Sequence, residues 1–221
     1  MKEVLLYGTS ANPPTGLQAH MGAVAYCRSL FDEVWLLPVY QHIYSSKRQL
    51  APFPHRVQMC KLVTNVLPKD NGALVKVQEC ERELFEHLAA QTAAPEELRI
   101  GSIDLIKYLR EQHPDASFTL LLGADTYNDL RTGKWKNGDE LQTLVKLLVM
   151  DRKGVDAPSQ QHENENATST DRVRFIHIPG LSDLSSTKVR ATRDVNELRS
   201  FVGADVAEYI VHHRLYGFAD E

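Results

Sequence analysis

The sequence contains no long run of lysine or arginine, and its 221 residues carry a formal net charge of −4. The positive surface that a duplex-binding protein presents to phosphates is therefore missing, and we expect no nucleic-acid partner. A small anionic substrate stays compatible with this charge, because it needs only a local positive site. No apolar run approaches the ~20 residues of a membrane helix, so we expect no membrane partner either.

Cysteines and targeting signals are also scarce. Cys27, Cys60 and Cys80 have neither the spacing of a zinc site nor that of a disulfide framework, which indicates a reducing compartment and predicts no metal held by protein ligands. The first residues lead directly into a strand-like segment, without the pattern of a signal peptide. We therefore expect an intracellular protein, foremost a cytoplasmic one, with a nuclear location left open.

The residues that are present favour an α/β protein. Hydrophobic residues make up 43% of the chain, enough to bury the core of a single domain over 1–221. Short Val-, Leu- and Ile-rich runs alternate with segments of helical spacing, which predicts a parallel sheet flanked by helices. The predicted strands are 3–7, 33–39, 73–78, 118–122, 146–150 and 173–178. The predicted helices between them are 18–30, 55–66, 103–112 and 139–144.

The last third of the chain changes character. Residues 154–171 are almost free of apolar side chains, so we predict a disordered polar insertion between two strands, with a lid over a site as the alternative. Beyond it, 185–193 and 204–216 have the pattern of helices. We expect 185–221 to form a small helical cap at the carboxyl side of the sheet.

The turn after the first strand, residues 8–20, is the first candidate for an anion site. Ligands of open α/β sheets bind at the carboxyl ends of strands, where this turn lies. Small residues such as Gly8, Thr9 and Ser10 let the backbone approach a phosphate, and the following helix start attracts an anion. His20 can add a donor or a positive charge. An ordinary turn with a surface histidine is the alternative.

A second candidate lies at 185–190, which reads Ser-Ser-Thr-Lys-Val-Arg and begins a predicted helix. Hydroxyl side chains at a helix start cap the helix or bind an anion, and Arg190 adds positive charge. A capped surface helix would explain Ser186. It would not explain two cations near a helix start, where the helix dipole disfavours them.

These two motifs resemble the signatures of the nucleotidylyltransferase superfamily, and the chain as a whole is similar to its nicotinate/nicotinamide mononucleotide adenylyltransferases. In the first motif, Gly8, Ser10, Asn12, Pro13 and Pro14 match directly. Thr15 and His20 correspond to the family's His/Thr and His pair. Here four residues separate them where two are usual, and Ala11 replaces an aromatic residue. The 185–190 string resembles the motif that grips the ATP triphosphate.

The resemblance extends over nearly the whole chain outside the polar insertion. The further matching stretches are 44–59 with Lys47, His55 and Arg56, the Gly123-Ala124-Asp125 string followed by Trp135, 149–154 with Arg152, and the terminal segment 206–216. The resemblance implies a Rossmann-like parallel sheet of the nucleotidylyltransferase type with a small C-terminal helical cap.

The function that the resemblance implies is adenylyl transfer from ATP to nicotinic acid mononucleotide or nicotinamide mononucleotide, giving a dinucleotide of the NAD type and pyrophosphate. The expected partners are these small molecules, with Mg²⁺ carried in by ATP, because the motifs offer donors and positive charge but no carboxylate cage. A phosphate nucleophile is already ionised at neutral pH, so positioning and charge neutralisation should dominate catalysis. The choice between the two acceptors and the oligomeric state, a homo-oligomer included, stay open.

Residue by residue, the resemblance assigns His20 and Arg190 to catalysis. The residues expected to bind ATP are Gly8, Thr9, Ser10, Thr15, His20, Gly123, Asp125, Arg152, Ser185, Ser186, Thr187 and Arg190. Those expected to bind the mononucleotide are Ser10, Ala11, Lys47, Arg56, Ser102 and Trp135.

Simpler interpretations stand beside several of these assignments. Lys47 could be a solvated lysine, Asp125 could cap the helix that follows it, and Arg152 could be a surface arginine at a strand end. Arg56 could pair with an acidic side chain, Ser102 could cap a helix, and Trp135 could belong to the core. If Trp135 stacks on the pyridine ring, its aromatic face contributes ~0.5 to 1.5 kcal/mol beyond area burial.

Two other functions compete with the main interpretation. One is nucleotidyl transfer to another phosphorylated acceptor, such as phosphopantetheine, or a phosphocholine-like substrate with CTP. The segment from Gly123 to Trp135 and the terminal helix disfavour it. The other is a nucleotide-binding sensor without catalysis, suggested by the lengthened turn between Thr15 and His20.

Overall fold

The computed structural model describes residues 1–41, 50–151 and 172–218, which contain a six-stranded sheet in the order β3-β2-β1-β4-β5-β6. Each neighbouring pair of strands is parallel. The strands are β1 (Lys2–Thr9), β2 (Glu33–Pro38), β3 (Leu74–Val77), β4 (Ala116–Gly123), β5 (Lys146–Asp151) and β6 (Val173–His177). All six predicted strands are confirmed, and so is the predicted α/β fold.

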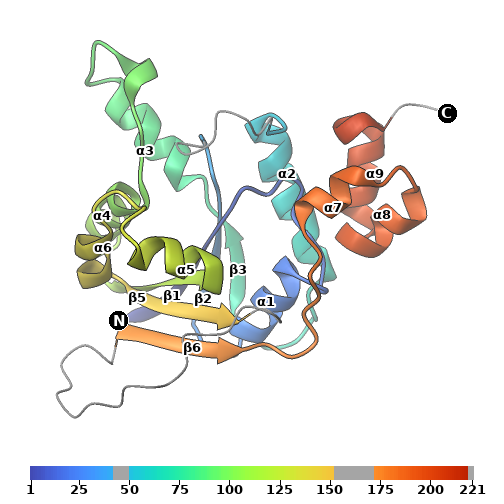
Figure 1. Cartoon of the computed structure of the whole chain (residues 1–221), viewed down its shortest axis with the longest axis horizontal. Helices are drawn as coiled ribbons and strands as arrows, with labels where there is room; N and C mark the ends of the chain where they lie inside the picture. The colour runs from blue at the N-terminus through green and yellow to red at the C-terminus, as the bar shows by residue number, and fades with distance from the viewer. Residues whose placement is uncertain (42–49, 152–171, 219–221) are drawn as a thin grey trace.

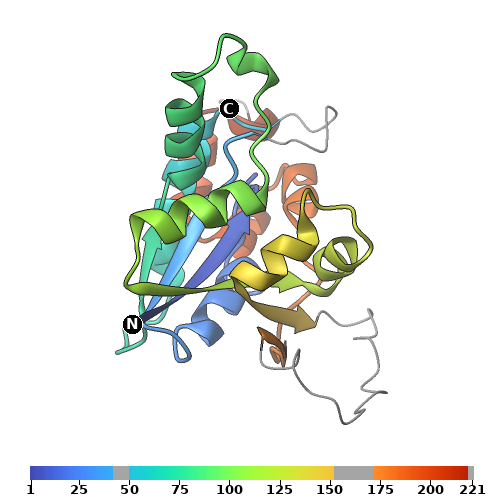
Figure 2. The same cartoon turned by 90° about the vertical axis from the view of Figure 1, so that its left-hand side faces the viewer.

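Helices cover both faces of this sheet (Figure 1). On one face lie α1 (His20–Cys27) and α2 (Phe53–Val63), and on the other α3 (Cys80–Ala89), α4 (Ser102–Gln112), α5 (Ala124–Arg131) and α6 (Gly138–Leu144). The C-terminal part consists of α7 (Ser186–Ala191), α8 (Val195–Val202), α9 (Ala204–His212) and the short 3₁₀ turn η4 (Leu215–Gly217). In Figure 2, α3 and α4 lie in front of the sheet and the C-terminal helices behind it.

The core follows from the alternation of side chains along the strands. Leu5 and Tyr7 of β1 point into the cluster beneath α1, α2 and the C-terminal helices. Val4 and Leu6 point into the opposite cluster, where Ile106 of α4 packs. Every residue of β2 is buried, as expected for a central strand covered on both faces.

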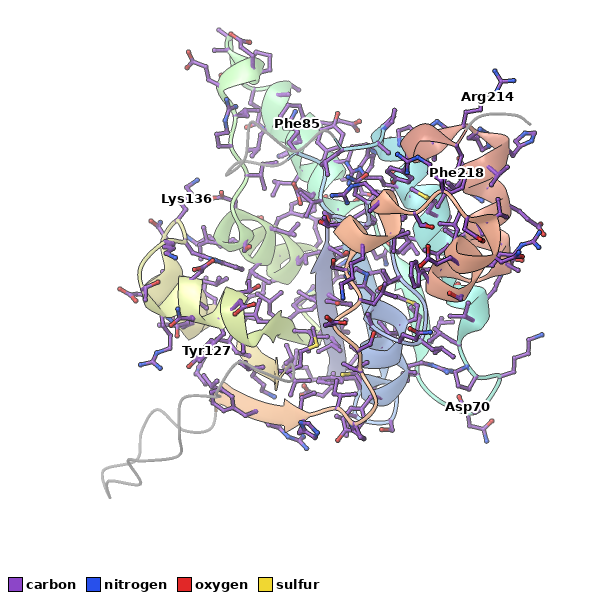
Figure 3. All side chains as sticks on the ribbon, turned by 45° about the vertical axis from the view of Figure 1, so that its right-hand side comes forward. Asp70, Phe85, Tyr127, Lys136, Arg214 and Phe218 are labelled. Carbon is purple, nitrogen blue, oxygen red and sulfur yellow. The ribbon has the colours of Figure 1, made fainter. Side chains whose placement is uncertain are left out.

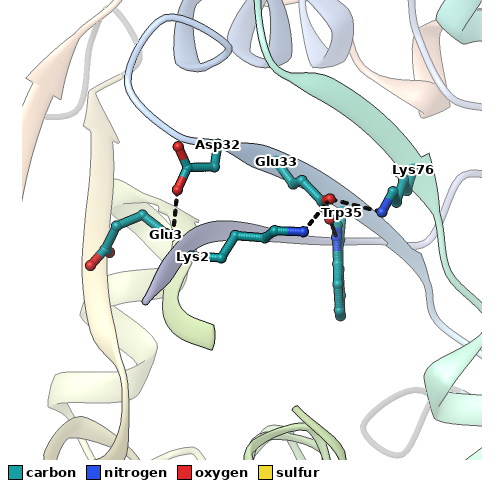
Figure 4. Close-up of polar contacts among 6 residues, drawn as sticks. All are labelled: Lys2, Glu3, Asp32, Glu33, Trp35 and Lys76. Atoms are coloured by element: carbon teal, nitrogen blue, oxygen red, sulfur yellow. Dashed lines mark hydrogen bonds and ion pairs between the residues drawn. The ribbon is translucent and has the colours of Figure 1, made fainter. Parts of the chain in front are cut away.

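The amino edge of the sheet carries an ionic network in which Glu33 is buried and its two lysine partners are partly exposed (Figure 4). The Glu33 carboxylate accepts hydrogen bonds from Lys2 Nζ and Lys76 Nζ, both at 2.8 Å, and from Trp35 Nε1 at 2.7 Å. Burial alone would raise the pKa of Glu33, but these hydrogen bonds lower it to about 2. The network ties β1, β2 and β3 together at one end.

The C-terminal part packs beside α2 rather than over the middle of the sheet. Val206, Ala207 and Ile210 of α9 are buried in the cluster shared with α2. Figure 3 shows Arg214 at the outer surface of this part and Phe218 on its inner side, where Phe218 is buried. The predicted cap is thus a helical flank whose first helix, α7, reaches the turn after β1.

Some sequence predictions missed elements or lie outside the description. Helices α3 and α8 were not predicted, although Cys80, Leu84, Leu198 and Val202 give each a buried i, i+4 pair. The predicted insertion at 154–171 lies outside the described residues. No helix among the described residues is long and apolar enough to cross a membrane.

Candidate active site

A cavity of about 430 Å³ opens at the carboxyl edge of the sheet, within the size range of sites for small ligands. The ends of β1 and β4 and the starts of α1, α4 and α5 line it. Of the residues predicted for the site, those that border the cavity are Gly8, Thr9, Ser10, His20, Ser102, Gly123, Asp125 and Trp135. The parallel topology thus gathers segments from distant parts of the sequence at one edge.

The lengthened first turn still brings Thr15 and His20 together. The Thr15 backbone N–H donates to His20 Nδ1 at 3.0 Å, and the His20 backbone N–H donates to Thr15 Oγ1 at 3.0 Å. Thr15 is fully buried, so its hydroxyl serves this pairing at the start of α1. Thr15 and His20 therefore stay in contact despite the extra residues between them.

The hydrogen bond from Thr15 also determines which nitrogen of the neutral His20 ring carries the proton. Because Nδ1 accepts a hydrogen bond from a backbone N–H, the neutral ring carries its proton on Nε2. The Tyr7 ring packs edge-on to the His20 ring, with 6.1 Å between the centroids. His20 therefore presents a hydrogen-bond donor from a held ring that borders the cavity.

The extra residues of the turn are themselves anchored to α8 and to the segment that precedes α7. The Gly16 N–H donates to the carbonyl of Phe201 at 2.7 Å, and the Ser182 N–H donates to the carbonyl of Gln18 at 2.8 Å. The lengthening of the turn is thus matched by contacts that hold it.

The second motif lies against the same turn. Ser185 is the N-cap of α7, and its side chain accepts from the Lys188 N–H. The Ser186 hydroxyl donates to the Pro13 carbonyl at 2.8 Å. Arg190 donates from one Nη to the Asn12 carbonyl at 2.5 Å and from the other to Thr187 Oγ1 at 3.2 Å. The two motifs, remote in sequence, form one structural unit.

Arg56 is placed differently from the prediction. Its side chain is only 2% exposed and donates to the carbonyls of Ser10, Val39, Tyr40 and Ala51. A guanidinium engaged in this way holds the turn and the loops after β2, which argues against the predicted contact with the mononucleotide phosphate. The acidic partner considered as the alternative is replaced by backbone carbonyls.

Ala11 was also predicted to contact the mononucleotide. Ala11 is fully buried, has a positive φ of 48°, and uses its N–H in a bond to Thr9 Oγ1. It does not border the cavity, so the predicted contact with the mononucleotide is not supported. Lys47 and Arg152 lie outside the described residues.

The opposite wall of the cavity comes from α4 and the loop before α6. The first residue of α4, Ser102, borders the cavity, and its helix is preceded by Gly101, whose N–H donates to Asp104 Oδ2 at 2.8 Å. Gly101, and not Ser102, is therefore the N-cap. Trp135 is half-buried, packs on the core cluster with part of its surface and borders the cavity with another part.

Sequence reasoning missed a carboxylate at this site. Glu81, near the start of α3, borders the cavity, and its Oε1 accepts from the Gln41 N–H at 3.2 Å. Burial raises the pKa of Glu81 to about 7, against the lowering effects of backbone N–H groups and of Arg56. Only the tertiary arrangement of α3 beside the end of β2 brings this residue to the cavity.

Curated relatives cover almost the same length as this chain. A protein from Anaeromyxobacter dehalogenans strain 2CP-C, named probable nicotinate-nucleotide adenylyltransferase, is 32% identical over 97% of both chains. A protein of the same name from Myxococcus xanthus is 29% identical over 97% of this chain and 95% of its own.

Solved structures support the fold. The nicotinic acid mononucleotide adenylyltransferase of Plasmodium falciparum, solved in complex with NaAD, matches with a TM-score of 0.71 at 21% identity, covering all of both chains. A family model described as cytidylyltransferase-like matches residues 6–192. These matches agree with the first turn, the second motif and the cavity at the carboxyl edge. The chain belongs to the cytidylyltransferase-like family, and its relatives are named probable nicotinate-nucleotide adenylyltransferases.

Proposed function

We propose that this protein transfers the AMP part of ATP to a pyridine mononucleotide, with nicotinic acid mononucleotide as the preferred acceptor, in the synthesis of NAD. The observation that carries the proposal is the cavity at the carboxyl edge. The turn after β1, with His20, borders it on one side, and Ser102 and Trp135 border it on the other. The names of the relatives point to the same reaction.

The reaction needs little covalent chemistry from the protein. A phosphate oxygen of the mononucleotide attacks the α-phosphorus of ATP and forms a new P–O bond. The bond from the α-phosphorus to the oxygen bridging to the β-phosphorus breaks, and its electron pair leaves with pyrophosphate. No proton has to be removed from the nucleophile, so orientation and charge neutralisation carry the rate enhancement.

The residues of the two motifs supply this neutralisation. His20 donates from Nε2 to a phosphate oxygen of ATP, because its Nδ1 is occupied by the Thr15 N–H. Arg190 is not among the described residues that border the cavity, but it keeps further N–H groups beyond its bonds to Asn12 and Thr187. In this proposal those groups bind the triphosphate. The Ser186 hydroxyl already donates to Pro13, so its contribution is to dock α7 on the turn.

The acceptor side favours a negatively charged pyridine substituent. The start of α4 borders the cavity at Ser102, and a helix N-terminus stabilises an anion such as the carboxylate of nicotinate. Trp135 offers a face on which the pyridine ring stacks. We expect kcat/KM for nicotinic acid mononucleotide to exceed that for nicotinamide mononucleotide by roughly tenfold or more, about 1.4 kcal/mol.

Magnesium enters with ATP in this proposal. Among the described residues no group of three or more His, Cys, Asp or Glu side chains is placed to hold a metal ion. The phosphates of ATP would then hold the ion, which would help to neutralise the departing pyrophosphate. Pyrophosphate release should stop in excess chelator and return when Mg²⁺ exceeds it.

The decisive experiment measures pyrophosphate release with a panel of acceptors. The purified protein receives ATP with nicotinic acid mononucleotide, nicotinamide mononucleotide or phosphopantetheine, and CTP with phosphocholine. Each product formed by nucleotidyl transfer is identified by mass. Release with the pyridine mononucleotides alone supports the proposal. Release only with another acceptor replaces it, and ATP binding without release under any condition would identify a sensor.

A further inference from the structure

Tyr216 reaches the first turn from the other end of the chain. Its hydroxyl donates to Asn12 Oδ1 at 3.0 Å, across 204 positions of sequence. The same oxygen accepts the backbone N–H of Ala51, also at 3.0 Å, and Asn12 is almost fully buried. The side chain of Asn12 therefore joins the turn to η4 and to the segment before α2.

The main chain of Asn12 is joined to the second motif. Its carbonyl accepts from Arg190 at 2.5 Å, and the next carbonyl, that of Pro13, accepts from Ser186 at 2.8 Å. One residue thus carries both the acceptor for Tyr216 and the acceptor for Arg190. Any movement of Asn12 that follows loss of the Tyr216 hydroxyl also moves the acceptor that orients Arg190.

The backbone around Tyr216 is held in a disfavoured conformation. Arg214 and Tyr216 have φ values of 53° and 57°, in the left-handed region that residues with a Cβ rarely adopt. Such conformations persist only where surrounding interactions over-determine them, and they concentrate at functional sites. Here the surroundings are the bond to Asn12 and the burial of Phe218 in the core cluster just beyond.

The phenol of Tyr216 keeps its proton at neutral pH. Burial raises its pKa above the ordinary value, and this effect exceeds the opposing influence of the Arg190 and Arg56 charges. The hydroxyl is therefore a donor to Asn12. Tyr216 is not among the described residues that border the cavity, so its effect on the reaction is indirect, and Asn12 is its hydrogen-bonded link to the turn.

We propose that Tyr216 is a positioning residue of the adenylyl-transfer site: through Asn12 it fixes the turn 8–20 relative to Arg190, so that His20 and Arg190 meet the same triphosphate. This inference rests on the proposed function. It gives the terminal segment a direct part in ATP handling, and it separates that part from the acceptor side at Trp135 and Ser102.

The test compares two tyrosines of the C-terminal part. Tyr216→Phe removes the bond to Asn12. Tyr209→Phe is the matched control, because its hydroxyl bonds to His55 Nδ1 at 2.8 Å, away from the turn. Both variants should lower Tm by a few degrees, as the loss of one partly buried hydrogen bond does. Only Tyr216→Phe should lower kcat, by roughly tenfold, because small misplacements of positioning groups slow the chemical step strongly.

Three further readouts separate positioning from mere stability. KM for the mononucleotide should change less than about twofold in Tyr216→Phe, while the affinity for ATP, measured by calorimetry, should fall roughly five- to tenfold. In the background of Asn12→Ala, adding Tyr216→Phe should have little further effect on kcat.

Equal kcat values for Tyr216→Phe and Tyr209→Phe, or independent effects of the two changes at 12 and 216, would overturn the inference. A wild-type protein that releases no pyrophosphate with any acceptor refutes the proposed function instead. In that case an ATP affinity unaltered by Tyr216→Phe overturns the positioning role as well.

Discussion

The two edges of the sheet each hold a glutamate, buried at the amino edge and half-buried at the carboxyl edge, and the two carboxyl groups behave in opposite ways. At the amino edge, Glu33 is surrounded by two lysines and an indole N–H, and its pKa falls to about 2. At the carboxyl edge, Glu81 borders the cavity, and burial raises its pKa to about 7. The same residue type is stabilised as a charge at one edge and disfavoured as a charge at the other.

The difference shows how one sheet separates stability from function. Polar groups at the amino edge are satisfied by other side chains of the protein, so they contribute to folding. Those at the carboxyl edge are oriented by the backbone and face the cavity, where a ligand completes their environment. Each edge also has its own histidine and its own tryptophan, which makes the contrast testable in matched pairs.

The largest effect is expected for the histidines. His20→Ala should reduce kcat by two orders of magnitude or more, because it removes a donor needed most in the transition state. It should lower Tm by only a few degrees, through loss of the bond from the Thr15 N–H. His113→Ala, at the amino edge beside Trp35, is the control and should keep normal turnover. Near-normal rates in His20→Ala would place phosphate stabilisation on other residues of the turn.

The tryptophans should separate KM from stability. Trp135→Ala should raise KM for the mononucleotide roughly tenfold, with a smaller change for ATP, because it removes the stacking face at the cavity. Trp35→Ala, 5% exposed and bonded to Glu33, should cost ~3 to 5 kcal/mol of stability. Steady-state kinetics with each substrate and urea unfolding distinguish the two roles of Trp135. Equal changes in KM for the mononucleotide and for ATP, together with a large loss of stability in Trp135→Ala, would show that Trp135 is a core residue.

Replacing Glu33 should affect stability and leave kinetics alone. A carboxyl group with a lowered pKa in the folded state stabilises above the unfolded value of about 4.5 and loses this effect as pH falls towards about 2. Glu33→Gln should therefore cost about 1 to 3 kcal/mol at pH 7 and progressively less in acid. Urea unfolding at pH 7 and pH 3.5 measures both; a constant difference would show that the charge is not the cause.

Glu81→Gln should have the reverse dependence on pH. With a folded pKa of about 7, the carboxyl group favours folding fully below about 4.5, and this contribution is lost as pH rises through about 7. The variant should be more stable than the wild type at pH 8, by an amount of order 1 kcal/mol, and equal to it near pH 4. Thermal unfolding across this range, with Glu33→Gln alongside, tests the opposite signs.

The smallest effect is expected for the polar stretch that lies outside the described residues. Deleting 159–169, a polar stretch by composition, should leave Tm and both KM values nearly unchanged. A large rise in either KM would instead identify this segment as a lid that contacts the substrates.

The strands were predictable because their signal is local. Apolar runs such as those at β2 and β5 are bounded by polar residues, and a parallel sheet buries them on both faces. Helix α8 was missed although Asp194 caps it and Leu198 and Val202 lie on one face. A short amphipathic segment of this kind is easily overlooked beside longer runs.

The site was predictable only where motif and topology coincide. His20 and Ser102 follow or begin elements at the carboxyl edge, so the pattern alone places them together. The contact of Arg56 with the mononucleotide stays a prediction, and the sequence does not show that backbone carbonyls surround its guanidinium. Glu81 belongs to no motif. Tyr216 lies in the matching terminal segment 206–216, but the sequence does not show that its hydroxyl reaches Asn12; both positions depend on how α3 and η4 pack.

The contacts between the first turn and the C-terminal part have a consequence for the order of folding. The bond from Arg190 to Asn12 closes a loop of 178 positions, so it can form only after nearly the whole chain has left the ribosome. The turn emerges first and becomes competent last. A nascent or truncated chain that ends before α7 could form most of its sheet and still be unable to bind ATP. In a refolding experiment, recovery of activity should therefore coincide with the slowest folding phase.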